Sequence, residues 1–196
     1  YDIPRLEVGM SMSRTFPIWG PLVGKFNGSI SAYADFAVGF DTKGFNTFRT
    51  SGDVVDILDG FFVSDRANAD GTGADVPEAG FKGRIGIGGA INAAIIEAGI
   101  EGFFELSADL DLKDPNDDGK IRGSEIIALL THPNGYGPLN LGSIHLRGDV
   151  GARAYVDFWA PFDWYNAWEW EFARVTLFDK VFTAPDVTPE VANTQV

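Results

Sequence analysis

The amino-acid sequence predicts a mostly β fold, either an antiparallel β-sandwich or a barrel-like sheet, with one or two short helices. It combines 24 glycines with 16 phenylalanines and only 2 methionines, a composition that suits strands and tight turns. Several segments alternate apolar and polar residues, which is the pattern of half-buried strands. With 196 residues, of which 45% are hydrophobic, the chain can bury one sizeable core. We therefore expect a single β-rich domain over residues 1–182.

Two strands are expected near the N-terminus. Apolar and polar residues alternate over residues 6–13 and again over residues 30–40. Pro17 and the pair Gly20-Pro21 break the first alternation. The two segments are therefore expected to form a hairpin with a long connection.

Two short helices are expected in the middle of the chain. Residues 51–59 cluster their apolar side chains on one helical side, and Ser51 or Asp53 can cap the first turn. Residues 124–131 form a second helix-compatible cluster of about two turns. The stretch over residues 64–78 is rich in Asp, Asn, Gly and Ala and is expected to be a loop.

The remaining segments predict further strands. Residues 81–99 fit either a strand or a short helix, whereas the alternation that follows Ile100 favours a strand. Residues 143–159 and 168–178 read as two long strands joined through Pro161-Phe162-Asp163. Residues 183–196 contain few large side chains, so we expect an extended C-terminal linker or docking arm.

Composition also limits the classes of partner. The net charge of −13 repels a phosphate backbone, so we expect no nucleic-acid partner, but it suits divalent cations. The absence of cysteine excludes disulfides and thiolate metal sites. No apolar stretch approaches the ~18 residues of a membrane-spanning helix, so we expect no transmembrane segment. The opening residues contain no signal-type apolar run, which suggests a processed product or a piece of a longer chain.

Residues 114–125 match the EF-hand calcium loop at positions 1, 3, 5, 6, 8 and 12. A hard cation takes oxygen ligands from several directions, so side-chain oxygens at every second residue suit it, and Gly119 permits the sharp bend. Lys120 would bind through its backbone carbonyl, and Glu125 would close the site with both carboxylate oxygens. The predicted Ca²⁺ ligands are Asp114, Asn116, Asp118, Lys120 and Glu125.

The flanks of this loop depart from the EF-hand pattern. The residues before Asp114 alternate like a strand, whereas those after Gly123 favour a helix. Ile121 is expected to anchor the loop in the core, and Arg122 at position 9 supplies no carboxylate. We therefore expect calcium to act as a structural staple and not as a conformational switch. An Asp- and Gly-rich turn without calcium is the alternative.

Three further groups of residues are candidates for binding or modification. Trp159, Trp164 and Trp168 could stack on sugar rings, or Trp168, Trp170 and Phe172 could form the buried face of a strand. Asn27 begins a glycosylation sequon in a turn-like context. An acidic set could form a second calcium site or a solvated loop, and it comprises Asp65, Asn68, Asp70 and Asp75. Catalysis is not expected, because the only histidines are His132 and His145 and no catalytic motif is present.

Four phrases, at residues 16–22, 40–45, 59–65 and 114–125, resemble modules of very large secreted bacterial surface proteins. The resemblance implies an extracellular or cell-surface location and a structural or adhesive role without catalysis. The leading functional hypothesis is a calcium-stabilised building block of an extracellular fibre, adhesin or surface assembly, which associates with copies of itself or with neighbouring modules. A carbohydrate-binding module is the main alternative. An outer-membrane barrel is a third, which requires a continuous lipid-facing apolar band.

Overall fold

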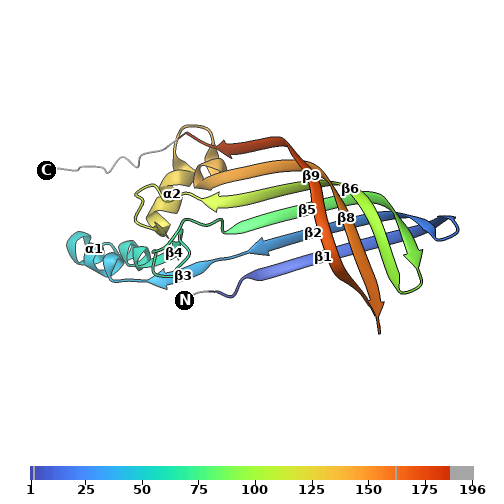
Figure 1. Cartoon of the computed structure of the whole chain (residues 1–196). Coiled ribbons are helices and arrows are strands. Elements are labelled where there is room, and N and C mark those ends of the chain that lie inside the picture. The colour runs from blue at the N-terminus through green and yellow to red at the C-terminus, as the bar shows by residue number, and fades with distance from the viewer. Residues whose placement is uncertain (2, 162, 186–196) are drawn as a thin grey trace.

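The computed structural model describes residues 1, 3–161 and 163–185 and consists of a long curved sheet with a small cap unit at one end (Figure 1). The long sheet has six strands in the order β1-β2-β5-β6-β8-β9, and all neighbours are antiparallel. Its strands are β1 (Leu6–Trp19), β2 (Leu22–Ala34), β5 (Ala79–Ala93), β6 (Ile96–Leu112), β8 (Gly142–Ala160) and β9 (Asp163–Thr183).

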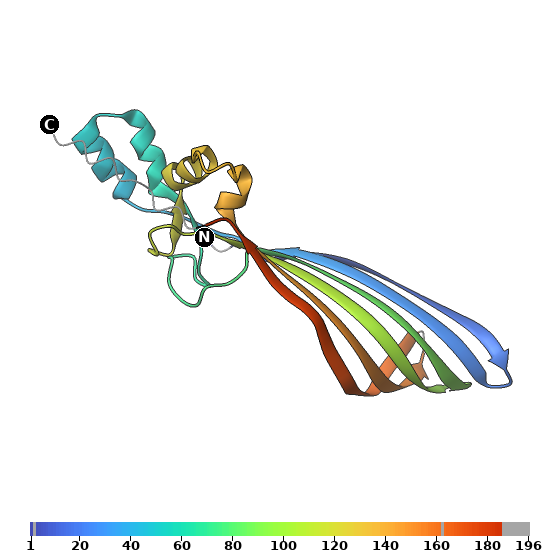
Figure 2. The ribbon, with the colours of Figure 1, turned by 90° about the horizontal axis from the view of Figure 1, so that it is seen from above.

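The cap unit is made from two insertions into this simple up-and-down order. The first lies between β2 and β5 and contains β3 (Ala37–Phe40), α1 (Lys43–Ser51), the 3₁₀ helix η1 (Val54–Gly60) and β4 (Phe61–Ser64). The second lies between β6 and β8 and contains β7 (Lys120–Arg122), α2 (Gly123–Thr131) and the 3₁₀ helix η2 (Gly137–Leu141). The insertions meet in a three-stranded sheet of order β3-β4-β7, so the cap sits at one end of the long sheet and leaves most of its length uncovered (Figure 2).

The two faces of the long sheet differ in chemistry, because residues directly opposite each other in antiparallel strands share a face. One row across the sheet runs Ile85, Phe104, Val150 and Val175, and the next runs Arg84, Glu105, Asp149 and Thr176. We call the face of the first row the apolar face and that of the second row the charged face.

Burial on these faces is the reverse of that in a water-soluble sheet. On the charged face Glu101 is only 2% exposed, whereas Ile87 and Ile100 on the apolar face are 67% and 63% exposed. The charged side chains are covered by one another and not by a second layer, which indicates that the sheet curls towards them. The small conventional core lies in the cap, where Phe62, Ile121 and Leu129 are buried.

The structure confirms the mostly β, antiparallel prediction and several of its elements. Asp53 caps η1 by accepting a hydrogen bond from the Val55 N–H at 2.9 Å, and α2 begins after the loop as predicted. The two long C-terminal strands are β8 and β9, which pair with each other. The strand expected after Ile100 is part of β6, which pairs with β5.

Three local predictions were wrong. The first strand passes through Pro17 to Trp19, which an edge strand tolerates because a ladder hydrogen bond is not required on its open side. The connection is therefore the two residues Gly20 and Pro21 and not a long loop. Residues 30–40 do not form one strand, since β2 ends at Ala34 and β3 joins the cap sheet. Helix α1 was not predicted.

The predictions about a membrane-spanning helix and about the C-terminal arm can be compared with the described residues only. None of the helices in the described ranges is both long enough and apolar enough to cross a membrane. Of the predicted C-terminal arm, Thr183 belongs to β9 and residues 186–196 lie outside the described residues.

The cap depends on the buried guanidinium of Arg122. It donates to Asp41 at 2.9 and 3.2 Å and to the backbone carbonyl of Asp59 at 2.7 Å, so it joins the two insertions. This pairing holds the pKa of Asp41 well below its usual range. Arg122 is 3% exposed, so losing its carboxylate partner would leave a buried charge without compensation.

We predict that Asp41→Asn destabilises the cap by roughly 2–3 kcal/mol, because Arg122 keeps its charge and loses its anionic partner. Hydrogen exchange of α1 and α2 measures this loss locally. The control Asp179→Asn removes a half-exposed pair with His145 and should cost less than about 0.5 kcal/mol. Equal protection in the wild type and Asp41→Asn would contradict the role of the pair.

Candidate functional site

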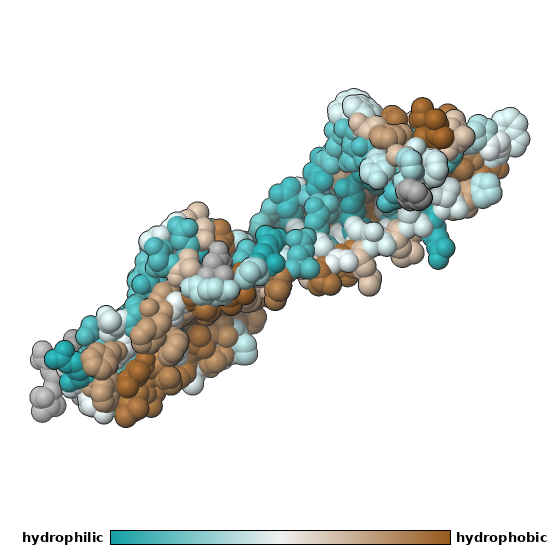
Figure 3. Space-filling model, turned by 90° about the horizontal axis from the view of Figure 1, so that it is seen from below, coloured by the Kyte–Doolittle hydropathy of each residue, from teal (hydrophilic) through white to brown (hydrophobic). Residues whose placement is uncertain are grey.

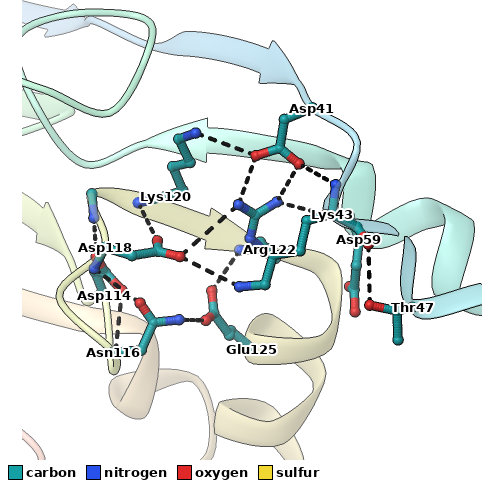
Figure 4. Close-up of polar contacts among 11 residues, drawn as sticks. Asp41, Lys43, Thr47, Asp59, Asp114, Asn116, Asp118, Lys120, Arg122 and Glu125 are labelled. Atoms are coloured by element: carbon teal, nitrogen blue, oxygen red, sulfur yellow. Dashed lines mark hydrogen bonds and ion pairs between the residues drawn. The ribbon is translucent and has the colours of Figure 1, made fainter. Parts of the chain in front are cut away.

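The predicted calcium loop leaves the end of β6 and enters α2 through the short strand β7, so its flanks are a strand and a helix as expected. Its side chains turn back on the backbone in a ladder (Figure 4). Asp114 accepts from the Asn116 N–H at 3.2 Å, Asn116 from the Asp118 N–H at 2.9 Å, and Asp118 from the Lys120 N–H at 3.0 Å. The ladder fixes the oxygen-bearing side chains at alternate residues around one centre.

The far end of the loop reaches back to the same centre. Glu125 accepts from the Arg122 N–H at 2.8 Å, which caps α2, and its other oxygen accepts from the side-chain amide of Asn116. Gly119 has a φ of +76° and its N–H donates to Asp114 at 2.6 Å, so the sharp bend occurs where the motif places it. Ile121 is 3% exposed, which confirms that it anchors the loop in the cap core.

Two cations lie beside the loop. Lys43 contacts Asp118 at 3.4 Å, and Arg122 approaches the same carboxylate at 3.9 Å while it bonds mainly to Asp41 (Figure 4). The side chain of Lys120 points away from the loop centre to Asp41 at 3.2 Å, so only its backbone carbonyl is available to a metal. Burial, with the nearby carboxylates of Asp118 and Asp114, raises the pKa of Glu125.

The donors present suit a hard divalent cation. The potential ligand atoms are all oxygens, from the carboxylates of Asp114, Asp118 and Glu125 and the amide oxygen of Asn116. The three carboxylates repel one another unless a cation lies between them. Bound calcium would supply charge compensation and cross-link the loop to α2. The ligand set itself remains a prediction.

A second acidic group lies at the junction of cap and sheet. Burial, with the carboxylates of Glu78 and Asp75, raises the pKa of Asp65 to about 8. Burial also raises the pKa of Glu78 to about 7, although its carboxylate accepts the Leu112 N–H at 2.7 Å. Of the acidic set predicted from sequence, Asn68 and Asp70 instead bond to Thr72 in the exposed part of the loop.

A network of charges crosses the charged face. Glu101 lies at its centre, with Arg153 at 3.2 Å, Arg84 at 3.6 Å and the amide of Asn27 as a donor. The network continues through Glu105 and Asp149, which share Arg174 at 3.2 Å each. Sequence reasoning missed this network, although the spacing of Glu97, Glu101 and Glu105 by four residues places all three on one face of a strand.

The structure corrects the context predicted for Asn27. It lies within β2 on the charged face and not in a turn, and it accepts from the Ser13 hydroxyl at 2.7 Å while donating to Glu101. Both the oxygen and the nitrogen of the Asn27 side-chain amide therefore take part in hydrogen bonds.

The three tryptophans proposed to contact sugars are all exposed. Trp159 and Trp164 lie opposite each other beside the β8–β9 turn, and Trp168 follows on the apolar face, so the alternative in which Trp168 is buried is wrong. Trp168 and Trp170 share this face, whereas Glu169 lies on the charged face and pairs with Arg153 at 2.6 Å. The aromatic residues thus gather at the end of the sheet farthest from the cap.

The space-filling view shows hydrophilic residues gathered along one side of the sheet and a hydrophobic area on the cap (Figure 3). Exposed apolar residues of the cap include Phe40, Leu58 and Phe61, each 58% exposed. They line a groove with a volume of about 640 Å³. Both units therefore expose apolar surface of a kind that is normally covered.

Comparison with known proteins gives no match to a family model, to a curated protein or to a solved structure.

We predict that calcium at 1 mM stabilises the protein by about 1.4 kcal/mol if the loop has an affinity near 10⁻⁴ M, which raises the melting temperature by roughly 3–6 °C. Calorimetry in calcium and in chelator measures the shift. A double variant, Asp114→Ala with Glu125→Ala, should reduce this shift, whereas Asp117→Asn, at a loop position that is not a predicted ligand, should keep it. Equal melting of the wild type with and without calcium would contradict the staple.

Proposed function

We propose that this chain is a calcium-stabilised, non-enzymatic structural element of a bacterial cell surface, whose apolar face lies against lipid acyl chains and whose charged face lines an aqueous interior. One observation carries this proposal, namely the reversed burial of the two faces. Strands that alternate apolar residues outward and polar residues inward are the pattern of sheets that cross a membrane. Between a sandwich and a barrel-like sheet, this arrangement favours the barrel-like sheet.

The length of the apolar face agrees with a bilayer. Along β6 it runs from Ile96 to Leu110 and carries no charged residue on that face. Such a segment extends roughly 50 Å, or roughly 35 Å in height when tilted by 45°, and the apolar band of membrane sheets is about 25 Å. Three charged residues lie on the apolar face, all away from its middle: Arg14 in β1 and Asp163 in β9 lie towards the hairpin tips, and Lys180 in β9 lies towards the cap.

The distribution of aromatic residues also supports the proposed contact of the apolar face with lipid. Trp19, at 82% exposure, lies beside the β1–β2 turn, and Trp159, Trp164 and Tyr165 lie beside the β8–β9 turn. Tryptophan and tyrosine gather where membrane meets water, because one part of the ring is apolar and another is polar. The tips of the hairpins would lie at one interface and the cap beyond the other.

The two open edges of the sheet indicate that it pairs with further strands. Strands β1 and β9 each pair with one neighbour only within the described chain. Because six alternating strands leave β1 and β9 running in opposite directions, β1 of one copy can pair antiparallel with β9 of the next, and all caps then lie on the same side. Self-association would close the sheet in multiples of six strands and remove both open edges.

Exposure of Trp159, Trp164 and Trp168 favours carbohydrate binding as the second candidate. Exposed indole rings can stack on sugar rings. Tryptophan fluorescence separates the two candidates, because soluble glycans would quench or shift it in water, whereas lipid contact requires vesicles.

We predict that purified protein needs detergent or lipid, and that brominated acyl chains quench its tryptophan fluorescence after reconstitution into vesicles. The variant Ile100→Arg, in the middle of the apolar face, should lose roughly 2–4 kcal/mol of membrane stability, whereas Ile95→Arg at the β5–β6 turn should lose about 0–1 kcal/mol. Flotation with vesicles after urea titration measures both variants.

The same experiment tests the fibre hypothesis. A fibre formed by packing apolar faces against each other would assemble in buffer without lipid and would show no quenching by brominated chains. Protein that is monodisperse in buffer and does not float with vesicles would refute lipid contact.

A further inference from the structure

Three acidic side chains from separate parts of the chain meet at the junction of cap and sheet. Asp65 directly follows β4, Asp75 lies in the loop before β5, and Asp111 is near the end of β6. One carboxylate oxygen of each lies within 4.8 Å of the other two. This set is separate from the predicted ligands of the loop over residues 114–125.

The carboxylates of this set lack the partners that buried charges need. Asp65 is 5% exposed and its Oδ1 has no hydrogen-bond partner, and Oδ1 of Asp111 has none either. No ion pair involves Asp65, Asp75 or Asp111 in the described part of the chain. A buried carboxylate without compensation costs several kcal/mol, so this arrangement calls for a cation.

The basic side chains around the site are engaged elsewhere. Arg66 lines the same cavity but bonds to Asp117 of the calcium loop. Lys113 also lines it and donates to the carbonyl of Ala184 at 3.3 Å. Neither of these contacts brings a positive charge to Asp65.

The space and the donors suit calcium. The three carboxylates border a cavity with a volume of about 380 Å³ that also reaches Asp114, so an ion could enter together with water ligands. Oxygens that are each 2.3–2.6 Å from one Ca²⁺ can lie up to about 5 Å apart, and calcium accepts irregular sets of six to eight oxygens. The separation within the acidic set is therefore compatible with a shared ion.

We propose that Asp65, Asp75 and Asp111 bind a second Ca²⁺, which fastens the loop over residues 65–78 to the end of β6. The ion would join the first insertion of the cap to the long sheet, whereas the loop over residues 114–125 holds the second insertion together. Sequence reasoning had placed Asp65 and Asp75 in an acidic set but omitted Asp111, which is distant in sequence.

The test is a calcium titration of the full-length protein in detergent by isothermal calorimetry. We expect two ions per chain in the wild type, and one in Asp65→Asn with Asp111→Asn. Because Asp75 is exposed, the single variant Asp75→Asn carries little risk of misfolding and should weaken the second site at least tenfold. Asp70→Asn, in the same loop but bonded to Thr72, is the matched control and should bind two ions.

The variants at Asp114 and Glu125 separate this inference from the predicted loop site. One ion that persists in the Asp114→Ala, Glu125→Ala protein and disappears in Asp75→Asn would support the proposal even if the loop binds nothing. Two ions in Asp75→Asn with unchanged affinity, or a single wild-type ion that depends only on Asp114 and Glu125, would overturn it.

Discussion

The long sheet depends on keeping ionised side chains together on one face. Glu101 and Asp149 are almost fully covered, and each is compensated by arginines from neighbouring strands. Breaking one such pair would leave a buried charge, whereas a complete network can be accommodated in a curled sheet. The strict alternation of side chains then forces the apolar residues outward. Charge pairing on one face and the lipid contact proposed for the other are thus two consequences of one pattern.

The cap and the sheet are stabilised by different physical means. The sheet has a ladder of backbone hydrogen bonds and a charged network, while the cap buries Phe62, Ile121 and Leu129 and places the buried Arg122 over the Phe62 ring. Calcium in the loop over residues 114–125 would add to the cap, and an ion at Asp65 would act at the boundary.

Much of the fold could be predicted from local patterns, because the period of two in residues 6–13 and 143–159 is a direct result of strand geometry. The loop over residues 114–125 could be recognised since its donors are contiguous. Helix α1 was missed because its sequence contains glycine and threonine, and its formation depends on packing of Gly44 against η1. The role of Asp111 was missed for another reason, since only the pairing of β5 with β6 brings it near Asp65.

The interleaving of the two insertions has a consequence for the order of folding. Strand β4 completes its sheet only by pairing with β7, which is synthesised after the whole β5–β6 hairpin. Until then Phe62 lacks Arg122 as its strand partner, and closing this connection costs chain entropy that local hairpins do not pay. The nascent chain would therefore hold a half-formed cap beside finished hairpins. The cap, whose first strands follow directly after β2, is therefore completed late.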